Sequence, residues 1–187
     1  MSREERLSYL PTYFKGLVTA ATMNHSIVDE AGGWKSCGVL MPPGSRVDNP
    51  WTLIPAGFIP MLWKVGLGGC QRMLGEYQTL GDGLKAKALK GQKKYYYVFF
   101  VGTLAEARGK GLCSAIMRSF QEMAARDQLP IWLEATTEKS MNLYQNLGWE
   151  VVGEGLLGEG KANADGIRCK GGEGVKIWGM IWRPAKV

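Results

Sequence analysis

The sequence predicts a single domain of mixed α/β class, and three observations support this prediction. The 187-residue chain is long enough to bury a core and short for two domains. Its second half alternates apolar, β-branched runs with amphipathic helical patterns. One such helix lies between two predicted strands, as in a right-handed crossover connection. We therefore expect residues 1–187 to form one α/β (α+β) unit in which helices flank a central sheet.

The first half of the chain predicts a long helix, a hairpin and broken helices. Ser2 and Glu5 form a capping box at the start of the first helix, and Pro11 inside it should produce a kink. We expect glycines to interrupt the broken helices at Gly68-Gly69 and at Gly81-Asp82-Gly83. The predicted helices are residues 3–22 and, interrupted, 51–89, and the predicted strands are 25–30 and 35–41.

The second half of the chain shows clearer periodicity. Residues 95–101 are an unbroken aromatic and β-branched run, typical of a strand buried on both faces. The helix that begins at Leu112 has an apolar face that includes Ile116, and Gln121 is predicted on its polar face. Glycine- and charge-rich residues 155–173 predict a mobile loop. The remaining predictions are strands at 130–135, 149–154 and 175–182 and a helix at 137–147.

Composition narrows the classes of function. A net charge of +6 suits an anionic partner such as a nucleotide cofactor, a nucleic acid or a membrane surface, without choosing among them. The four cysteines form no CxxC pair and there is one histidine, so we predict no metal site. The most apolar stretch, residues 51–74, is broken by prolines, glycines and Lys64, which makes it a poor membrane span. With no signal-peptide pattern, we expect a cytoplasmic protein.

A glycine-containing turn carries the strongest chemical signal. The run Arg108-Gly109-Lys110-Gly111-Leu112-Cys113 follows a predicted buried strand and opens a helix. Glycines let the backbone approach a phosphate closely, and the free N–H groups and dipole of the helix favour its negative charge. Arg108 and Lys110 add cationic donors. The arrangement therefore favours binding of a pyrophosphate, although a single motif of this kind has low specificity.

A second glycine-rich run competes for the same role. Residues 155–162, Gly-Leu-Leu-Gly-Glu-Gly-Lys-Ala, satisfy the GxxxxGK part of a phosphate-binding Walker A loop. Ala162 stands where that loop needs a hydroxyl for magnesium, and residues 163–166 do not begin a helix. We interpret this run as a hairpin loop with a chance resemblance.

Together with a second motif, the first run resembles the GNAT superfamily of acyl-CoA N-acyltransferases. Residues 108–113 match the family's Q/R-x-x-G-x-G/A signature except at Cys113. Residues 140–149 resemble its second signature, a tyrosine-bearing helix that ends in Gly-Phe or Gly-Trp before a strand. The resemblance covers a cofactor-binding core at about residues 94–185, and it looks nearest to puromycin N-acetyltransferase-like and fungal members.

The resemblance implies a GNAT fold, a mixed and mostly antiparallel sheet flanked by helices. It also implies transfer of an acetyl group from acetyl-CoA to a primary amine of a small molecule, with neither metal nor nucleic acid nor membrane as partner, and it leaves a homodimer open. In the family, the central strand pairs with the pantetheine arm and the following turn binds the pyrophosphate. The matching residues are Val101 and Thr103 for the arm, and Arg108, Gly109, Lys110, Gly111, Leu112, Cys113 and Ser114 for the pyrophosphate.

Two further residues are candidates for the chemistry. By resemblance, Tyr144 stands close to the cofactor sulfur and protonates or hydrogen-bonds the departing thiolate, while a backbone N–H of the central strand meets the thioester oxygen. Glu134, a carboxylate inside an apolar strand, is a candidate base or substrate contact. Each has an alternative role, because Tyr144 can be a core aromatic and Glu134 can face solvent or a salt-bridge partner.

The start of the chain departs from the family pattern. Members usually begin with a strand and a helix that help to wall the acceptor site, and nothing before residues 3–22 supplies them. A truncated or non-catalytic CoA-binding protein is therefore one alternative. A nucleic-acid-binding module that uses the basic residues and Tyr95-Tyr96-Tyr97 is another, ranked lower because those tyrosines lie in a run predicted to be buried.

Overall fold

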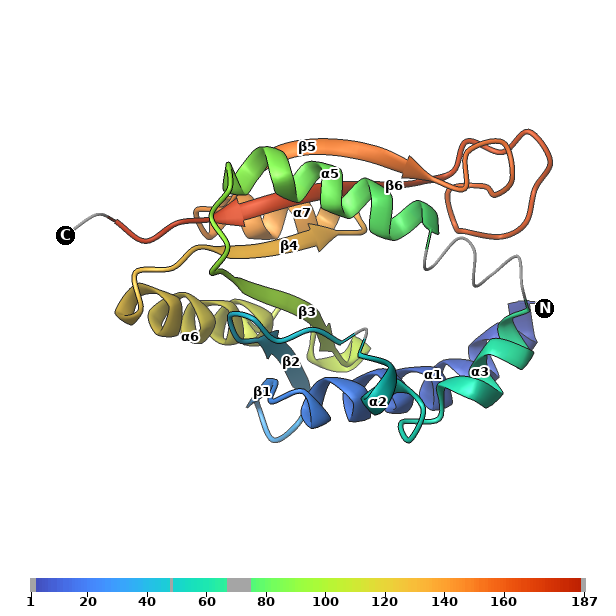
Figure 1. Ribbon diagram of the computed structural model, residues 1–187, viewed down its shortest axis with the longest axis horizontal. Helices are drawn as coiled ribbons and strands as arrows, with labels where there is room; N and C mark the ends of the chain where they lie inside the picture. Colours follow the sequence, from blue (N-terminus) through green and yellow to red (C-terminus); the bar gives the residue numbers. More distant parts are fainter. Residues whose placement is uncertain (1–2, 48, 67–74, 186–187) are drawn as a thin grey trace.

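The computed structural model describes residues 3–47, 49–66 and 75–185, and Figure 1 shows a central sheet flanked by helices. The strands are β1 (Ile27–Ala31), β2 (Ser36–Met41), β3 (Tyr96–Thr103), β4 (Ile131–Ala135), β5 (Glu150–Leu157) and β6 (Val175–Trp182). The helices are α1 (Arg3–Met23), α2 (Pro50–Leu53), α3 (Phe58–Val65), α5 (Tyr77–Leu89), the 3-10 turn η2 (Ala105–Ala107), α6 (Leu112–Arg126) and α7 (Glu138–Asn146). The predicted mixed α/β class is confirmed.

The sheet has six strands in the order β1-β2-β3-β4-β6-β5. Neighbouring strands are antiparallel except β3 and β4, which are parallel and joined through α6. These two strands pair only at Tyr96–Ile131 and Tyr97–Trp132 and then separate toward their C-terminal ends, as Figure 1 shows. We call this divergence the β3–β4 splay. It leaves residues 98–103 of β3 without a β4 partner.

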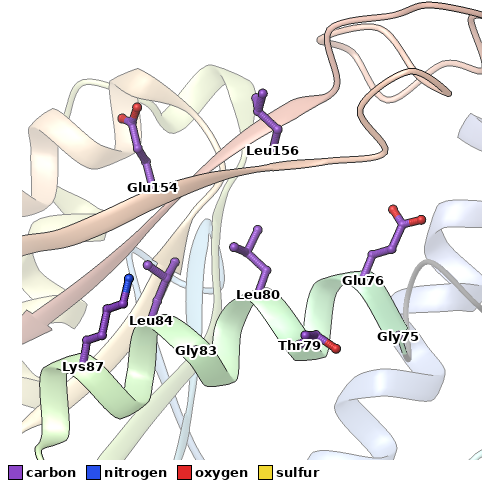
Figure 2. A pocket seen from close by; sticks show the side chains of 9 residues that line it. All are labelled: Gly75, Glu76, Thr79, Leu80, Gly83, Leu84, Lys87, Glu154 and Leu156. Atoms are coloured by element: carbon purple, nitrogen blue, oxygen red, sulfur yellow. The ribbon is translucent and has the colours of Figure 1, made fainter.

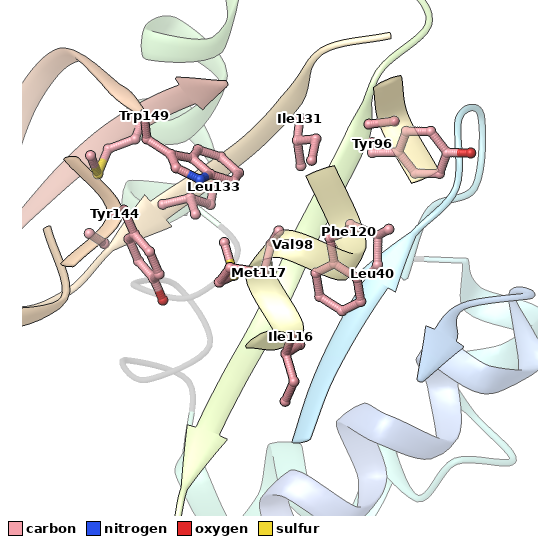
Figure 3. Close-up of a cluster of buried hydrophobic side chains, with 13 residues drawn as sticks. Leu40, Tyr96, Val98, Ile116, Met117, Phe120, Ile131, Leu133, Tyr144 and Trp149 are labelled. Carbon is pink, nitrogen blue, oxygen red and sulfur yellow. The ribbon is translucent and has the colours of Figure 1, made fainter. Parts of the chain in front are cut away.

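Side chains alternate between the two faces of β4, so each face has its own core. Ile131 and Leu133 pack with α6 and α7 in the larger cluster, which Figure 3 shows. Trp132 points the other way and packs with Leu84 of α5. The α6/α7 face is formed by apolar residues four apart on α6, such as Ile116 and Phe120, both fully buried.

The α5 face depends on glycines in the sheet. A Cβ atom added to Gly155 would lie 2.5 Å from Leu80, and one added to Gly153 would lie 2.8 Å from Leu84. At Gly179 the added atom would lie 2.6 Å from the ring of Trp132. Because these distances are shorter than any ordinary carbon contact, the three glycines let α5 lie directly on β5 and β6.

The predicted interruption of α5 at Gly81–Gly83 is wrong. The helix runs without a break from Tyr77 to Leu89, because burial of Leu84 and Ala88 against the sheet outweighs the low helix propensity of glycine. The other predicted interruption, at Gly68-Gly69, and the Ser2 half of the predicted capping box lie outside the described residues. The first helix extends through Pro11, as far as Met23.

Two further predictions need correction. Gln121 is buried, not solvent-facing, and its Nε2 donates to the carbonyl oxygen of Leu147 at 2.8 Å, which ties α6 to the end of α7. His25 is not part of the first strand, because its φ of 62° places it in the left-handed region of a turn.

The glycine-rich segment after the fifth strand also begins later than predicted. β5 extends to Leu157, so the first residues of the Walker-like run belong to a strand. The loop that follows folds back on itself, with Gly160 N donating to Gly172 O at 2.7 Å and a bridge between Ala162 and Arg168. In the part of the chain that the structure describes, no helix is long and apolar enough to cross a bilayer.

Candidate functional site

The turn before α6 places free backbone donors at the end of β3. Gly109 and Gly111 have φ angles of 75° and 76°, a region that other residues rarely adopt, and open space surrounds both. The first intrahelical bond runs from Ala115 N to Gly111 O at 2.9 Å. The amides of Leu112, Cys113 and Ser114 therefore lack an intrahelical acceptor and, with the helix dipole, suit an anion.

The cationic side chains predicted for this turn lie on its surface. Arg108 and Lys110 are both exposed, and Arg108 Nε donates to the carbonyl oxygen of Thr103 at 3.4 Å, which links the turn to the end of β3. Thr103 in turn shares a hydrogen bond of 2.8 Å between its hydroxyl and that of Ser36 in β2. Val101 is half-buried against the α6/α7 cluster. The turn is thus tied to the end of β3, the part of that strand that has no β4 partner.

Tyr144 projects from α7 toward the start of α6. The helix begins with a capping box between Thr137 and Ser140, which fixes its first turn. The Tyr144 ring is 8 % exposed, lies 6.0 Å from that of Trp149, and points its hydroxyl away from Trp149 (Figure 3). Burial, followed by the proximity of Cys113, raises the pKa of Tyr144, so its hydroxyl stays protonated across the physiological range.

Glu134 lies on the α5 face of β4, the face opposite to Tyr144. Its carboxylate accepts hydrogen bonds from three neutral donors. Its Oε1 accepts from Trp132 Nε1 at 2.6 Å. Its Oε2 accepts from the hydroxyls of Tyr97 at 2.8 Å and of Tyr77 at 3.3 Å. We call these four residues the Glu134 cluster. Glu134 is half-buried, and it forms no salt bridge with the described residues.

The two phenols of the Glu134 cluster are held neutral. Burial is the main cause that raises the pKa of Tyr97 and of Tyr77, and the negative charge of Glu134 adds to it. Sequence reasoning did not link Tyr77, Tyr97 or Trp132 to Glu134. The spacing of Trp132 and Glu134, two residues apart on one face of a strand, is the signal that would have linked them.

The two candidate catalytic residues lie on opposite sides of the sheet at the splay. Leu133 packs with Tyr144 in the α6/α7 cluster, whereas the adjacent Glu134 faces α5. Glu134 lies two residues beyond the last β3–β4 pair, where the strands separate. A ligand arm that lies along β3 would therefore have Tyr144 on one side and Glu134 on the other.

The remaining sequence candidates lie elsewhere. Tyr96 is buried with its hydroxyl donating to Asp127, and Tyr97 belongs to the Glu134 cluster, so neither offers a ring for stacking on bases. His25 and Cys169 are exposed and away from the splay. Among the described residues, no group of three His, Cys, Asp or Glu side chains could hold a metal ion.

A groove of about 670 Å³ is lined by residues of α5 and β5, and Leu80 and Leu84 of α5 point toward β5 (Figure 2). Glu76, Lys87 and Glu154 are its charged lining residues. Its lining includes neither the α6 turn nor the Glu134 cluster. It is therefore separate from the residues that the sequence singled out.

The family model and the curated relative that match this chain both describe acetyltransferases. A model of the acetyltransferase (GNAT) family matches residues 64–149. A curated relative, an uncharacterised N-acetyltransferase of Schizosaccharomyces pombe, is 22% identical over 149 residues, which are 79% of this chain and 60% of the relative. The chain thus spans about 60% of the length of the curated relative that it matches.

Two solved structures share the fold. A Corynebacterium glutamicum structure described as histone acetyltransferase HPA2 and related acetyltransferase superposes with a TM-score of 0.60 at 18% identity, covering 100% of this chain and 80% of its own. Arylalkylamine N-acetyltransferase 2 from Aedes aegypti gives a TM-score of 0.60 at 14% identity, covering 94% and 80%. The family match, the curated relative and the solved folds agree, and residues 64–149 of this chain are similar to the acetyltransferase (GNAT) family.

Proposed function

We propose that this chain transfers the acetyl group of acetyl-CoA to a primary amine of a small molecule. The observation that carries the proposal is the α6 turn, whose open glycines and free helix-start amides follow the part of β3 that has no β4 partner. This combination suits a ligand with a pyrophosphate and a long polar arm. The name of the mosquito neighbour, an arylalkylamine N-acetyltransferase, is consistent with a small amine as acceptor.

Acetyl-CoA binds along one continuous path in this proposal. Its pyrophosphate accepts hydrogen bonds from amides in the turn from Gly109 to Ser114, and Arg108 and Lys110 add positive charge. Its pantetheine arm pairs with the β3 backbone at Val101 and Thr103. Cys113, which replaces the small residue that the family prefers, contributes its backbone amide, so a thiol is compatible with this role.

The reaction is direct attack of the amine nitrogen on the thioester carbonyl carbon. The N–C bond forms, the C–S bond breaks, and coenzyme A leaves as its thiolate. Because burial raises the pKa of Tyr144 above that of a thiol, its hydroxyl stabilises the thiolate chiefly by donating a hydrogen bond. The proton released by the amine passes by way of Glu134 or solvent and finally resides on the thiol. Positioning of amine and thioester supplies much of the rate enhancement.

Release of free thiol from acetyl-CoA tests the proposal. The purified chain is incubated with acetyl-CoA and each member of a panel of small primary amines, and thiol and N-acetylated product are both quantified. We expect amine-dependent thiol release with one product per thiol. Stabilisation by acetyl-CoA without release on any amine would overturn the enzyme proposal in favour of a non-catalytic CoA-binding protein.

A further inference from the structure

We propose that the acceptor is an arylalkylamine, with its ammonium group at Glu134 and its ring on a band of aromatic side chains. The inference rests on the proposed function, which it narrows from primary amines in general to one chemical class. The band consists of rings from α1 and β3 that lead away from the Glu134 cluster. We call it the aromatic band, and its members are Tyr13, Phe14, Tyr97, Phe99 and Phe100.

Glu134 has no positively charged partner among the residues that the structure describes. Its hydrogen bonds come from an indole and two phenols, all neutral, and no described lysine or arginine forms an ion pair with it. Lys85 lies over the ring of Tyr97, but its ammonium pairs with Asp82 at 3.4 Å. Carboxylates away from bulk water are normally paired with a cation. A ligand ammonium would supply the missing charge.

The carboxylate also has room for one more donor. A carboxylate offers about four lone-pair positions, and three donors occupy positions on Glu134. The two phenols cannot take the role of a cation, and they remain protonated because burial raises the pKa of each. One N–H of an ammonium group can therefore complete the coordination of Glu134.

The hydrogen bonds of the described Glu134 cluster converge on one carboxylate, that of Glu134. A polyamine would need a second carboxylate for its second cation, whereas a monoamine needs one. The charge of the described cluster therefore matches an amine with a single positive charge.

The aromatic band continues from Glu134 toward the surface. The Tyr97 ring lies 6.1 Å from that of Phe99, which stacks on Phe100 at 4.4 Å. Phe100 meets Phe14 of α1 edge to face at 5.6 Å. Phe14 is 43% exposed, and Phe99 and Phe100 are half-buried, so the band reaches solvent at its α1 end. A run of rings that ends at an uncompensated carboxylate favours an aromatic body with a cationic head.

The aromatic band adjoins the Glu134 cluster at β3. Tyr97 belongs to both groups and occupies the last β3–β4 pair, next to the splay. An amine held at Glu134 would therefore lie beside the position that the proposed function gives to the thioester.

Matched amines test the inference by steady-state kinetics. We would measure kcat/KM for 2-phenylethylamine, n-butylamine and 1,4-diaminobutane, and expect the first to exceed each of the others by about tenfold, the factor that ring packing of this kind can supply. Phe99→Leu should remove most of this preference, because it should lower kcat/KM for 2-phenylethylamine more than for n-butylamine. Glu134→Gln should lower kcat/KM for all three amines. Phe58→Leu, outside the band, serves as the matched control and should keep the preference.

A binding readout separates failure of the inference from failure of the proposed function. Thermal unfolding with coenzyme A present should show stabilisation by 2-phenylethylamine that Phe99→Leu and Glu134→Gln both reduce, with the unfolding transition itself confirming that each variant folds. Equal turnover of butylamine and phenylethylamine, or preference for the diamine, would overturn the inference and leave the proposed function intact. Ring-dependent binding with no acetylation of any amine would support the inference and overturn the proposed function.

Discussion

The two faces of the sheet at the β3–β4 splay are built by different means. On the α6/α7 face, Ile116, Phe120 and Leu133 form an apolar core with Tyr144 at its margin. On the α5 face, a half-buried carboxylate accepts three hydrogen bonds, and α5 packs on glycines. The first face arises from local periodicity and the second from contacts between distant segments. In the proposed function, Tyr144 and Glu134 therefore act from faces of the sheet that are built independently.

The largest expected change in the free energy of unfolding is a loss on the α5 face. In Gly179→Ala the new Cβ would lie 2.6 Å from the ring of Trp132. Because Trp132 is fully buried, we expect the free energy of unfolding to fall by about 2 kcal/mol, measured by chemical denaturation. Gly83→Ala is the control, since nothing lies within 4 Å of its added atom, and it should stabilise α5 by about 0.5–1 kcal/mol. Equal effects of the two substitutions would contradict the packing described for this face.

Substitution of Tyr144 tests the chemistry proposed for the α6/α7 face. Tyr144→Phe removes the hydroxyl that would stabilise the thiolate, and we expect kcat to fall by about a hundredfold. Binding of acetyl-CoA, followed by thermal unfolding, should be nearly unchanged. Tyr95→Phe removes a phenol from a position outside the site and should keep kcat. A variant Tyr144→Phe with full activity would assign Tyr144 to the core alone.

Gly81 offers a smaller and more local perturbation of the Glu134 cluster. A Cβ at this position would lie 3.2 Å from Glu134 Oε1, whereas the same change at Gly83 meets nothing. We expect Gly81→Ala to gain less stability than Gly83→Ala, by about 0.5 kcal/mol, because the carboxylate must move slightly. Amine kcat/KM should fall a few-fold in Gly81→Ala only. A drop in both variants would point to α5 as a whole rather than to Glu134.

The smallest effect expected is a change in alkaline stability at the α6/α7 core. Burial, followed by the hydrogen bond to Asp127, raises the pKa of Tyr96 to about 12, from an ordinary value of 10.0. A phenol whose pKa is raised on folding stabilises the fold below pH 10, and this contribution is lost as the pH rises from 10 toward 12. Tyr96→Phe should therefore flatten the decline of stability over that window, measured by denaturation at successive pH values. An unchanged slope would contradict the pKa shift.

Local signals explain what could be predicted from the sequence. The strand at 175–182 has the predicted bounds and the helix at Leu112 has the predicted start, because β-branched runs and apolar residues four apart specify each without reference to other segments. The glycine turn before α6 is likewise a local motif. The cofactor roles of its residues, and those of Tyr144 and Glu134, stay predictions.

The contacts of the α5 face, where the amine acceptor is proposed to bind, could not be predicted in the same way. Tyr77 and Tyr97 are 57 and 37 residues from Glu134 in the chain, and no local pattern links them. Gln121 was assigned to a polar face because helical periodicity carries no information about the end of α7 that it contacts. Gly81 and Gly83 were predicted to interrupt α5, but Gly81 lies against the carboxylate of Glu134 and Gly83 faces open space. Each error concerns a contact between elements.

Thermal unfolding with and without acetyl-CoA tests the central claim most directly. We would compare the parent chain with Arg108→Glu and with Lys170→Glu, a control that makes the same charge reversal at an exposed position in the loop after β5. Acetyl-CoA at a hundredfold its dissociation constant should stabilise the parent by about 2.7 kcal/mol, a rise of several degrees in Tm. The account predicts that this rise persists in Lys170→Glu and shrinks in Arg108→Glu. No rise in the parent at millimolar acetyl-CoA, or an equal rise in all three proteins, would contradict the assignment of the α6 turn to the pyrophosphate.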